Sequence, residues 1–156
     1  MDAGSAEKFV EKALRSCRNK ANGKASMIMD YLHSGDTWAH SMFRYCLARR
    51  ISTYLRATCP VVKAVYIFGS TVDDRAGITS DIDLLVVVRN RNRRLIRRIG
   101  ELKTAVLGAY KGLIGNGTSA LAEILDISIL EEKESVKRTG CASLIHSVHS
   151  PALLLA

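Results

Sequence analysis

Two aspartates stand two residues apart at the start of an apolar run. Asp81 and Asp83 flank Ile82, and residues 82–88 have the composition of a buried strand. Because side chains alternate along a strand, both carboxylates project from one face while Ile82 points to the other. Neighbouring carboxylates repel each other, and a divalent cation removes that cost. Since Mg²⁺ prefers hard oxygen ligands, the pair predicts a magnesium site. The alternative is a turn at the strand end, with Asp81 as a local cap.

A third aspartate lies in another apolar segment. Asp126 stands between Leu125 and Ile127, and we expect residues 121–130 to form a strand. A charge inside a strand is costly unless it is paired or binds a metal. If this strand lies beside the strand over 82–88, three carboxylates converge. Three carboxylates can hold two Mg²⁺ ions, which is the arrangement for in-line displacement at phosphorus. The alternative is a solvent-facing residue on an edge strand.

A Gly-Ser pair follows the first expected strand. Residues 61–68 are β-branched and aromatic, and Gly69-Ser70 ends this run abruptly. Glycine lets the backbone approach a phosphate closely, while the serine hydroxyl and nearby amides donate hydrogen bonds. The pair therefore predicts a phosphate-binding bend, with a plain tight turn as the alternative. Ser80 either belongs to the same nucleotide site or caps the turn before the next strand.

Helices are expected on both sides of these strands. Periodicity predicts helices over 5–20 (with Ser5 as N-cap), 24–33, 38–57, 92–110 and 131–139. Residues 112–119 read as a loop. The order predicts an α+β fold with a small mixed β-sheet and flanking helices, preceded by an N-terminal helical segment. We expect residues 1–60 to form that segment, packed on a core domain of residues 61–156.

The helix expected over 38–57 is long and amphipathic. Asp36 or Thr37 is expected to cap its start, and Pro60 to end it. Its apolar stripe comprises Phe43, Leu47, Ile51, Tyr54 and Leu55. We place Arg44 and the other arginines of this helix elsewhere on the surface.

The composition is that of an ordinary globular protein with an excess of basic residues. The 156 residues are 47% hydrophobic and 24% charged, which excludes a disordered chain. A net charge of +8 favours anionic partners such as nucleotides or nucleic acid. No apolar run approaches the length of a membrane span, and the first ten residues lack the apolar region of a signal peptide. The four cysteines are far apart, so we expect reduced thiols in a cytoplasmic protein. A small domain with exposed helices is also compatible with an oligomer.

Six arginines crowd residues 89–98, directly after the strand over 82–88. One interpretation is a solvated helix face. The other is a docking surface for nucleic acid or an acidic protein. No aromatic residue is interleaved with these arginines, so base stacking is not indicated.

The motif Gly69-Ser70, ten intervening residues and then Asp81-Ile82-Asp83 resembles the signature of the DNA polymerase β-type nucleotidyltransferase superfamily. The segments VYIF and SDIDLLVVV are similar to those of its minimal, antitoxin-like branch. The likeness covers roughly residues 61–130.

This resemblance implies a Mg²⁺-dependent enzyme that moves a nucleoside monophosphate, AMP from ATP, to an acceptor hydroxyl. It assigns metal binding to Asp81, Asp83 and Asp126, activation of the acceptor to Asp126, and triphosphate binding to Gly69 and Ser70. Small members of the branch pair with a helical HEPN-type protein, which makes such a partner a candidate acceptor. The alternatives are a catalytically weak, antitoxin-like binding module and a nucleic-acid-binding module.

One segment departs from the pattern of the branch. Minimal members often carry Arg-Gly shortly after the Gly-Ser pair, whereas Asp73 and Asp74 follow it here and Arg75 comes late. Two acids beside a triphosphate weaken its binding unless they face solvent. The assignment therefore requires that both side chains point away from the site.

Overall fold

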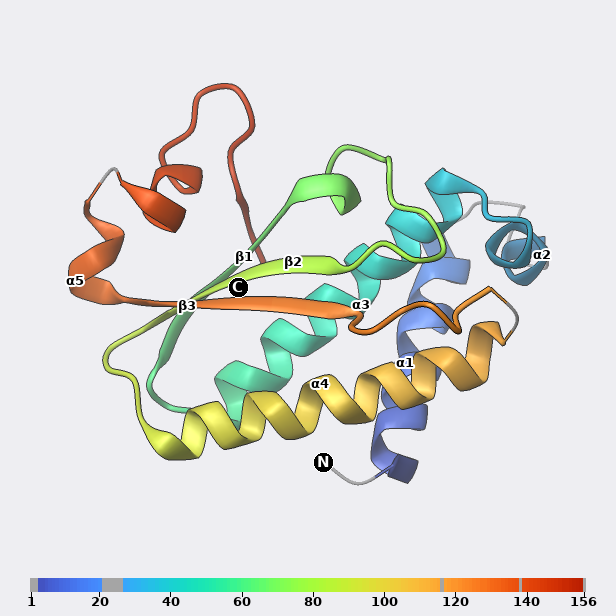
Figure 1. Cartoon of the computed structure of the whole chain (residues 1–156), viewed down its shortest axis with the longest axis horizontal. Helices are drawn as coiled ribbons and strands as arrows, with labels where there is room; N and C mark the ends of the chain where they lie inside the picture. Colours follow the sequence, from blue (N-terminus) through green and yellow to red (C-terminus); the bar gives the residue numbers. More distant parts are fainter. Residues whose placement is uncertain (1–2, 21–26, 116, 138, 156) are drawn as a thin grey trace.

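A computed structural model describes residues 3–20, 27–115, 117–137 and 139–155 of the chain (Figure 1). Three helices come first: α1 (Ala3–Lys20), α2 (Ile28–His33) and α3 (Thr37–Thr58). The remaining elements are β1 (Val62–Phe68), the 3₁₀ turn η2 (Gly69–Thr71), β2 (Ile82–Val88), α4 (Arg93–Ile114), β3 (Leu125–Glu131), α5 (Glu132–Ser135), the 3₁₀ turn η3 (Gly140–Leu144) and β4 (Leu153–Leu154).

α3 begins at a capping aspartate and ends before a proline. Asp36 Oδ1 accepts a hydrogen bond from the Ala39 amide at 2.8 Å, so Asp36 rather than Thr37 is the cap. Pro60 follows the last turn, as expected. The expected apolar stripe is confirmed: four of its members are fully buried, namely Phe43, Leu47, Ile51 and Leu55.

The strands form one mixed sheet in the order β3-β2-β1-β4. β1 pairs antiparallel with β2 and β4, whereas β2 and β3 are parallel. A parallel pair needs a long crossover that returns the chain to the same edge of the sheet, and α4 supplies it. The structure thus confirms a mixed sheet with flanking helices and an N-terminal helical segment.

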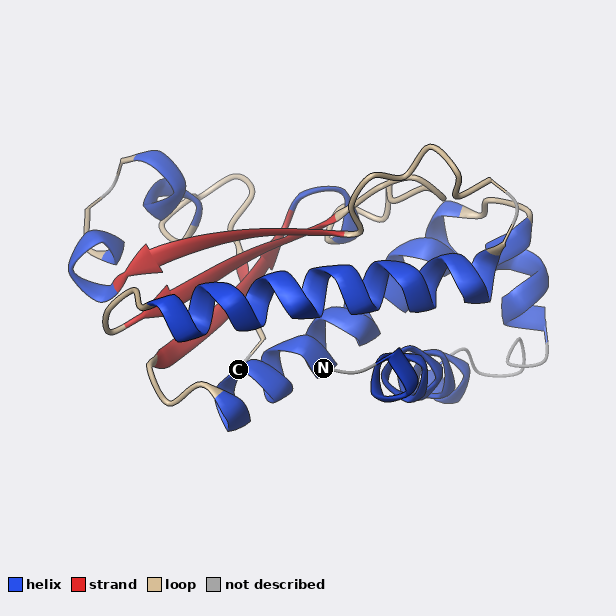
Figure 2. Cartoon of the chain, turned by 60° about the horizontal axis from the view of Figure 1, so that its bottom comes forward, coloured by secondary structure: helices blue, strands red, loops and turns tan. Residues whose placement is uncertain are grey.

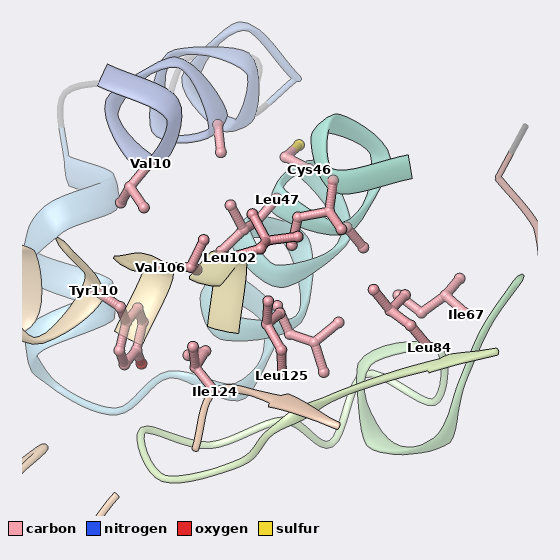
Figure 3. Close-up of a cluster of buried hydrophobic side chains, with 14 of the residues drawn as sticks. Val10, Cys46, Leu47, Ile67, Leu84, Leu102, Val106, Tyr110, Ile124 and Leu125 are labelled. Carbon is pink, nitrogen blue, oxygen red and sulfur yellow. The ribbon is translucent and has the colours of Figure 1, made fainter. Parts of the chain in front are cut away.

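Helices cover one face of the sheet (Figure 2). α3 and α4 contact the strands, and α1 packs across α3 and α4. Alternate residues of the strands enter this core, as Figure 3 shows for Ile67, Leu84 and Leu125 near Leu47 and Leu102. Period-two alternation then leaves the intervening strand residues, including Asp83, on the opposite face.

The segment after β3, which includes α5 and η3, lies on that opposite side of the sheet before the chain returns to form β4 (Figure 2). Leu85 and Val87 point to this side and are nevertheless buried. Ala142 and Ala152 of the segment are buried as well. The Ala152 amide donates to Leu144 O at 2.9 Å, and β4 pairs with β1. This segment therefore covers part of the outer face of the sheet and leaves the end that carries the aspartates uncovered.

Several boundaries differ from the expectation. α4 continues to Ile114, into the expected loop, because this residue is buried against the core, and the helix ends at Gly115 with φ of 69°. β3 begins only at Leu125, since 121–124 is irregular although partly buried. Within the described part of the expected 131–139 helix, only the four residues of α5 are helical. Ser5 lies inside α1 and is not its N-cap. Residues 24–26 of the expected second helix lie outside the described residues.

Arg44 is the main correction to the expected surface. Its side chain is fully buried, whereas the sequence placed it outside. Arg44 stands four residues after the buried His40 and three before Leu47, so all three share the core-facing side of α3. Its donors are satisfied by hydrogen bonds, which lets a cation occupy an interior position.

Within the described part of the chain, none of the helices combines the length and apolar character that a membrane crossing needs. The cysteines are free thiols: Cys17, Cys46 and Cys59 are buried, and Cys141 is exposed.

Candidate active site

The three predicted aspartates meet at one end of the sheet. β2 and β3 run parallel, so both strands begin at the same edge, and Asp83 pairs in register with Asp126. Asp81 lies directly before β2, and because it is two residues from Asp83 its side chain points to the same face of the sheet. Sequence-distant carboxylates thus converge because the α4 crossover brings β3 back beside β2 in this register.

The carboxylates are close enough to share a cation. Asp81, Asp83 and Asp126 each offer an oxygen atom, and these atoms all lie within 4.8 Å of one another. Burial, and after it the neighbouring Asp81 and Asp126 carboxylates, together raise the pKa of Asp83 to about 6. Three hard oxygen donors at this spacing fit a divalent metal such as Mg²⁺, which would neutralise their charge.

Gly69 brings the bend after β1 against the Asp83 carboxylate. The last residue of β1, Phe68, pairs with Asp83, and Gly69 follows with φ of 73°. A Cβ at position 69 would overlap Asp83 Oδ2 and lie 3.0 Å from its Cγ. Glycine is therefore required by both the backbone angle and the lack of space. Ser70 is half-buried next to it within η2.

Asp73 and Asp74 both face solvent. Asp73 forms an ion pair with Arg75 at 2.5 Å, and Asp74 adopts a left-handed φ of 55°, which aspartate tolerates in a tight turn. The condition set by the sequence comparison with the minimal branch is met. Neither carboxylate belongs to the group formed by Asp81, Asp83 and Asp126.

A hollow of about 490 Å³ opens beside the carboxylates. It is lined by Thr79, Asp81, Ala120, Leu121, Ala122, Glu123 and Asp126. The irregular segment before β3 supplies most of this wall, which is a consequence of the strand starting later than expected. The hollow gives a substrate direct access to Asp81 and Asp126.

The turn before β2 is closed by Ser80. Its hydroxyl oxygen accepts a hydrogen bond from the Gly77 amide at 2.9 Å, as expected for a turn cap. The Ser80 amide in turn donates to Gly77 O at 3.2 Å. The serine hydroxyl still has its own proton to donate to a ligand.

Sequence reasoning missed the residues behind this turn. His40, Ser41 and Arg44 of α3, together with Tyr110 of α4, are buried and polar or partly polar. Ser41 Oγ accepts from the Ala76 amide at 3.1 Å. A signal was present, because polar residues at 40, 41 and 44 interrupt the buried face of an amphipathic helix.

The Arg-rich run lies at the other end of β2. The carboxylates stand at the start of β2, and Arg89 follows its last residue, about 20 Å further on at 3.3 Å per residue. Arg91 is tied to the end of β3: it donates to Ile129 O at 2.7 Å and pairs with Glu134. Arg93, Arg94 and Arg97 are exposed. These arginines therefore do not line the carboxylate cluster.

Comparison with known families agrees with this geometry. The model of the nucleotidyltransferase domain family matches residues 48–146, which is more than half of the chain. The chain therefore belongs to the nucleotidyltransferase domain family. The match begins within α3 and includes the bend after β1 and all three aspartates. No curated protein and no solved structure matches the chain.

Proposed function

We propose that this protein is a Mg²⁺-dependent nucleotidyltransferase that moves AMP from ATP to an acceptor hydroxyl. The observation that carries the proposal is the convergence of Asp81, Asp83 and Asp126 within 4.8 Å, beside a glycine bend, in a chain of this family. All three carboxylates would hold the metal, which would supply positive charge to the phosphate oxygens in the reaction.

The residues of the chain have distinct roles in this reaction. The bend at Gly69 and Ser70 would hold the triphosphate through backbone amides and the serine hydroxyl, with Ser80 as a further donor. The acceptor oxygen attacks the α-phosphorus, and the bond between this phosphorus and the leaving pyrophosphate breaks. Asp126, which is exposed at the hollow, receives or orients the acceptor proton. Positioning of the reactants in line supplies much of the rate enhancement.

The acceptor is proposed from the resemblance to the minimal branch, as a hydroxyl on a helical HEPN-type partner protein. The exposed position of Asp126 and the open hollow support a large acceptor that approaches from solvent. We do not assign acceptor binding to the Arg-rich run, because it follows the far end of β2.

The test is transfer of label from ATP carrying a radioactive α-phosphate, with Mg²⁺ and three acceptor classes: a helical partner protein, an RNA end and small hydroxyl compounds. We expect label on one class and pyrophosphate release. Asp83→Asn should reduce transfer at least about a hundredfold, because it removes a metal ligand. Asp30→Asn, an exposed aspartate on α2, is the matched control and should keep wild-type activity. Absence of transfer by the wild-type protein, with partner binding retained in Asp83→Asn, would point instead to an antitoxin-like binding module.

A further inference from the structure

Asp81 lies outside the strand ladder that holds the other two carboxylates. Asp83 and Asp126 are paired residues of β2 and β3. Asp81 belongs to the segment between η2 and β2, so strand pairing does not fix its own position. Residues 77–81 must be held by other contacts for the three carboxylates to keep their spacing.

The guanidinium of Arg44 reaches this segment from α3. Its Nε donates to Ser80 O at 3.1 Å, and its Nη2 donates to the same oxygen at 2.9 Å and to Ile78 O at 3.1 Å. Its Nη1 donates to His40 Nδ1 at 2.7 Å, and the ring donates from Nε2 to Leu32 O at 2.9 Å. The carbonyl directly before Asp81 therefore accepts two hydrogen bonds from one buried side chain.

A second helix supports the same segment. Tyr110 of α4 donates from its hydroxyl to Ile78 O at 3.0 Å and accepts from Arg44 Nη2 at 3.0 Å. The guanidinium carbon of Arg44 lies 5.3 Å from the centre of the Tyr110 ring, a cation–π distance. Two helices of the core thus hold residues 76–80 from behind, with Ser41 at the Ala76 amide.

The buried charge of Arg44 forms no ion pair with any of the described residues. Burial lowers the pKa of Arg44, while Tyr110 and then the Asp81 carboxylate raise it. A buried cation is costly when apolar packing would serve as well. The fork of donors on the guanidinium matches several carbonyls at once, which lysine and apolar residues cannot do.

We propose that Arg44 is a positioning residue of the active site: its hydrogen bonds fix residues 77–81 and thereby set where Asp81 stands in the carboxylate cluster. The proposal rests on the proposed function only in taking that cluster as a metal site. It gives the N-terminal helices a part in the chemistry, because the side chain that holds the segment comes from α3.

Loss of Arg44 has two opposing effects on cation binding. Removing a positive charge near Asp81 strengthens the attraction for a metal ion. Removing the donors leaves Ser80 O without both of its hydrogen bonds and releases the segment, which weakens metal binding. We expect the second effect to win, since partners that orient metal ligands change metal affinity about 10–100-fold.

The experiment compares Arg44→Met, Arg44→Lys and the control Arg49→Met, an exposed arginine of the same helix. Mn²⁺ affinity is measured by calorimetry, and amide hydrogen exchange of residues 76–81 is measured without metal. We expect Arg44→Met and Arg44→Lys both to bind Mn²⁺ at least about tenfold more weakly and to exchange faster in this segment. Arg49→Met should match the wild type in both measurements.

Three outcomes overturn the proposal. Tighter Mn²⁺ binding by Arg44→Met would show that charge rather than position decides, and wild-type affinity in Arg44→Lys would show that charge alone suffices. Unchanged exchange of residues 76–81 in Arg44→Met would show that other contacts hold the segment. If Arg44→Met does not fold, Arg44→Lys decides both measurements, because it also lacks the fork of donors to Ser80 O and Ile78 O, and unchanged exchange in it overturns the proposal equally.

The exchange measurement also separates this proposal from the proposed function. If the wild-type protein does not bind Mn²⁺ or transfer AMP, the proposed function fails. The effect of Arg44→Met on residues 76–81 would still decide whether Arg44 fixes the position of Asp81.

Discussion

Gly69 lies so close to Asp83 that a side chain at position 69 would occupy the space of the carboxylate. The bend that is proposed to bind phosphate and the carboxylate that is proposed to bind metal are therefore in direct contact across β1 and β2. Pairing of Phe68 with Asp83 in the antiparallel ladder creates this contact. The antiparallel pairing thus brings the Gly-Ser motif and the Asp-x-Asp motif, which are separated along the chain, into contact in one site.

The Gly69→Ala variant tests this contact. The added methyl group must displace Asp83, so we expect Mn²⁺ affinity to fall at least about tenfold and AMP transfer to fall with it. Gly35→Ala is a matched control, because Gly35 has a similar φ of 80° but nothing within 4 Å of an added Cβ. It should lose about 1 kcal/mol of stability and keep wild-type metal affinity. Equal metal affinities of the two variants would contradict the assignment.

Asp83 should make the metal-free protein less stable as the pH rises. Its pKa is raised from 3.8 to about 6, so the folded protein holds this proton more tightly than the unfolded chain does. Stability therefore falls as the pH rises from about 4 to 6, and the whole penalty is present above pH 6. We expect metal-free Asp83→Asn to melt a few degrees above the wild type at pH 7.5 and at the same temperature near pH 4.

Mg²⁺ should reverse this difference at pH 7.5. A cation that binds the ionised cluster stabilises only the folded wild-type protein, in proportion to its occupancy. Thermal melts in EDTA and in Mg²⁺ measure both effects in one experiment. Equal stabilisation of the wild type and Asp83→Asn by Mg²⁺ would mean that the ion binds elsewhere.

Part of the site could be predicted from sequence because strand periodicity is strict. A spacing of two residues places Asp81 and Asp83 on one face whatever the rest of the fold does. The convergence with Asp126 depends on a parallel pairing in one register, which the crossover and the core determine together. The sequence pattern of each strand alone did not predict whether β2 and β3 would be parallel or antiparallel.

Arg44 shows why the rest could not be predicted. Arginine is usually exposed, and Arg49 and Arg56 of the same helix are exposed as expected. The burial of Arg44 depends on hydrogen bonds to the carbonyls of residues 78 and 80, which are more than thirty positions away in the sequence and lie beside it only in the folded chain. In the same way, α4 extends to Ile114 because a buried contact outweighs the weak helix propensity of Gly112.

His40 should make the protein sensitive to acid. Burial, and after it the Arg44 cation, together lower its pKa from 6.5 to about 4. The unfolded chain binds this proton more readily, so the stability that His40 contributes is present above pH 6.5 and is lost as the pH falls towards 4. Between pH 7.5 and 5 the loss should be about 2 kcal/mol in urea unfolding.

His40→Gln should remove this component of the pH dependence, and His149→Gln, an exposed histidine, should retain it. Comparing each variant with the wild type isolates His40 from Asp83, whose contribution has the opposite sign over much of the same range. An identical slope in His40→Gln and the wild type would mean that the folded protein binds this proton as readily as the unfolded chain does.

Neutralising the Arg-rich run should leave the chemistry unchanged. Arg93, Arg94 and Arg97 are exposed at the start of α4, beyond the far end of β2 from the carboxylates. Because charges about 20 Å apart are largely screened at physiological salt, replacing all three by Gln should keep Mn²⁺ affinity and AMP transfer to a small acceptor within about twofold. Any binding of RNA at low salt should weaken in the triple variant, with a shallower dependence on salt concentration. A tenfold loss of transfer to the small acceptor would show that this surface acts on the active site itself.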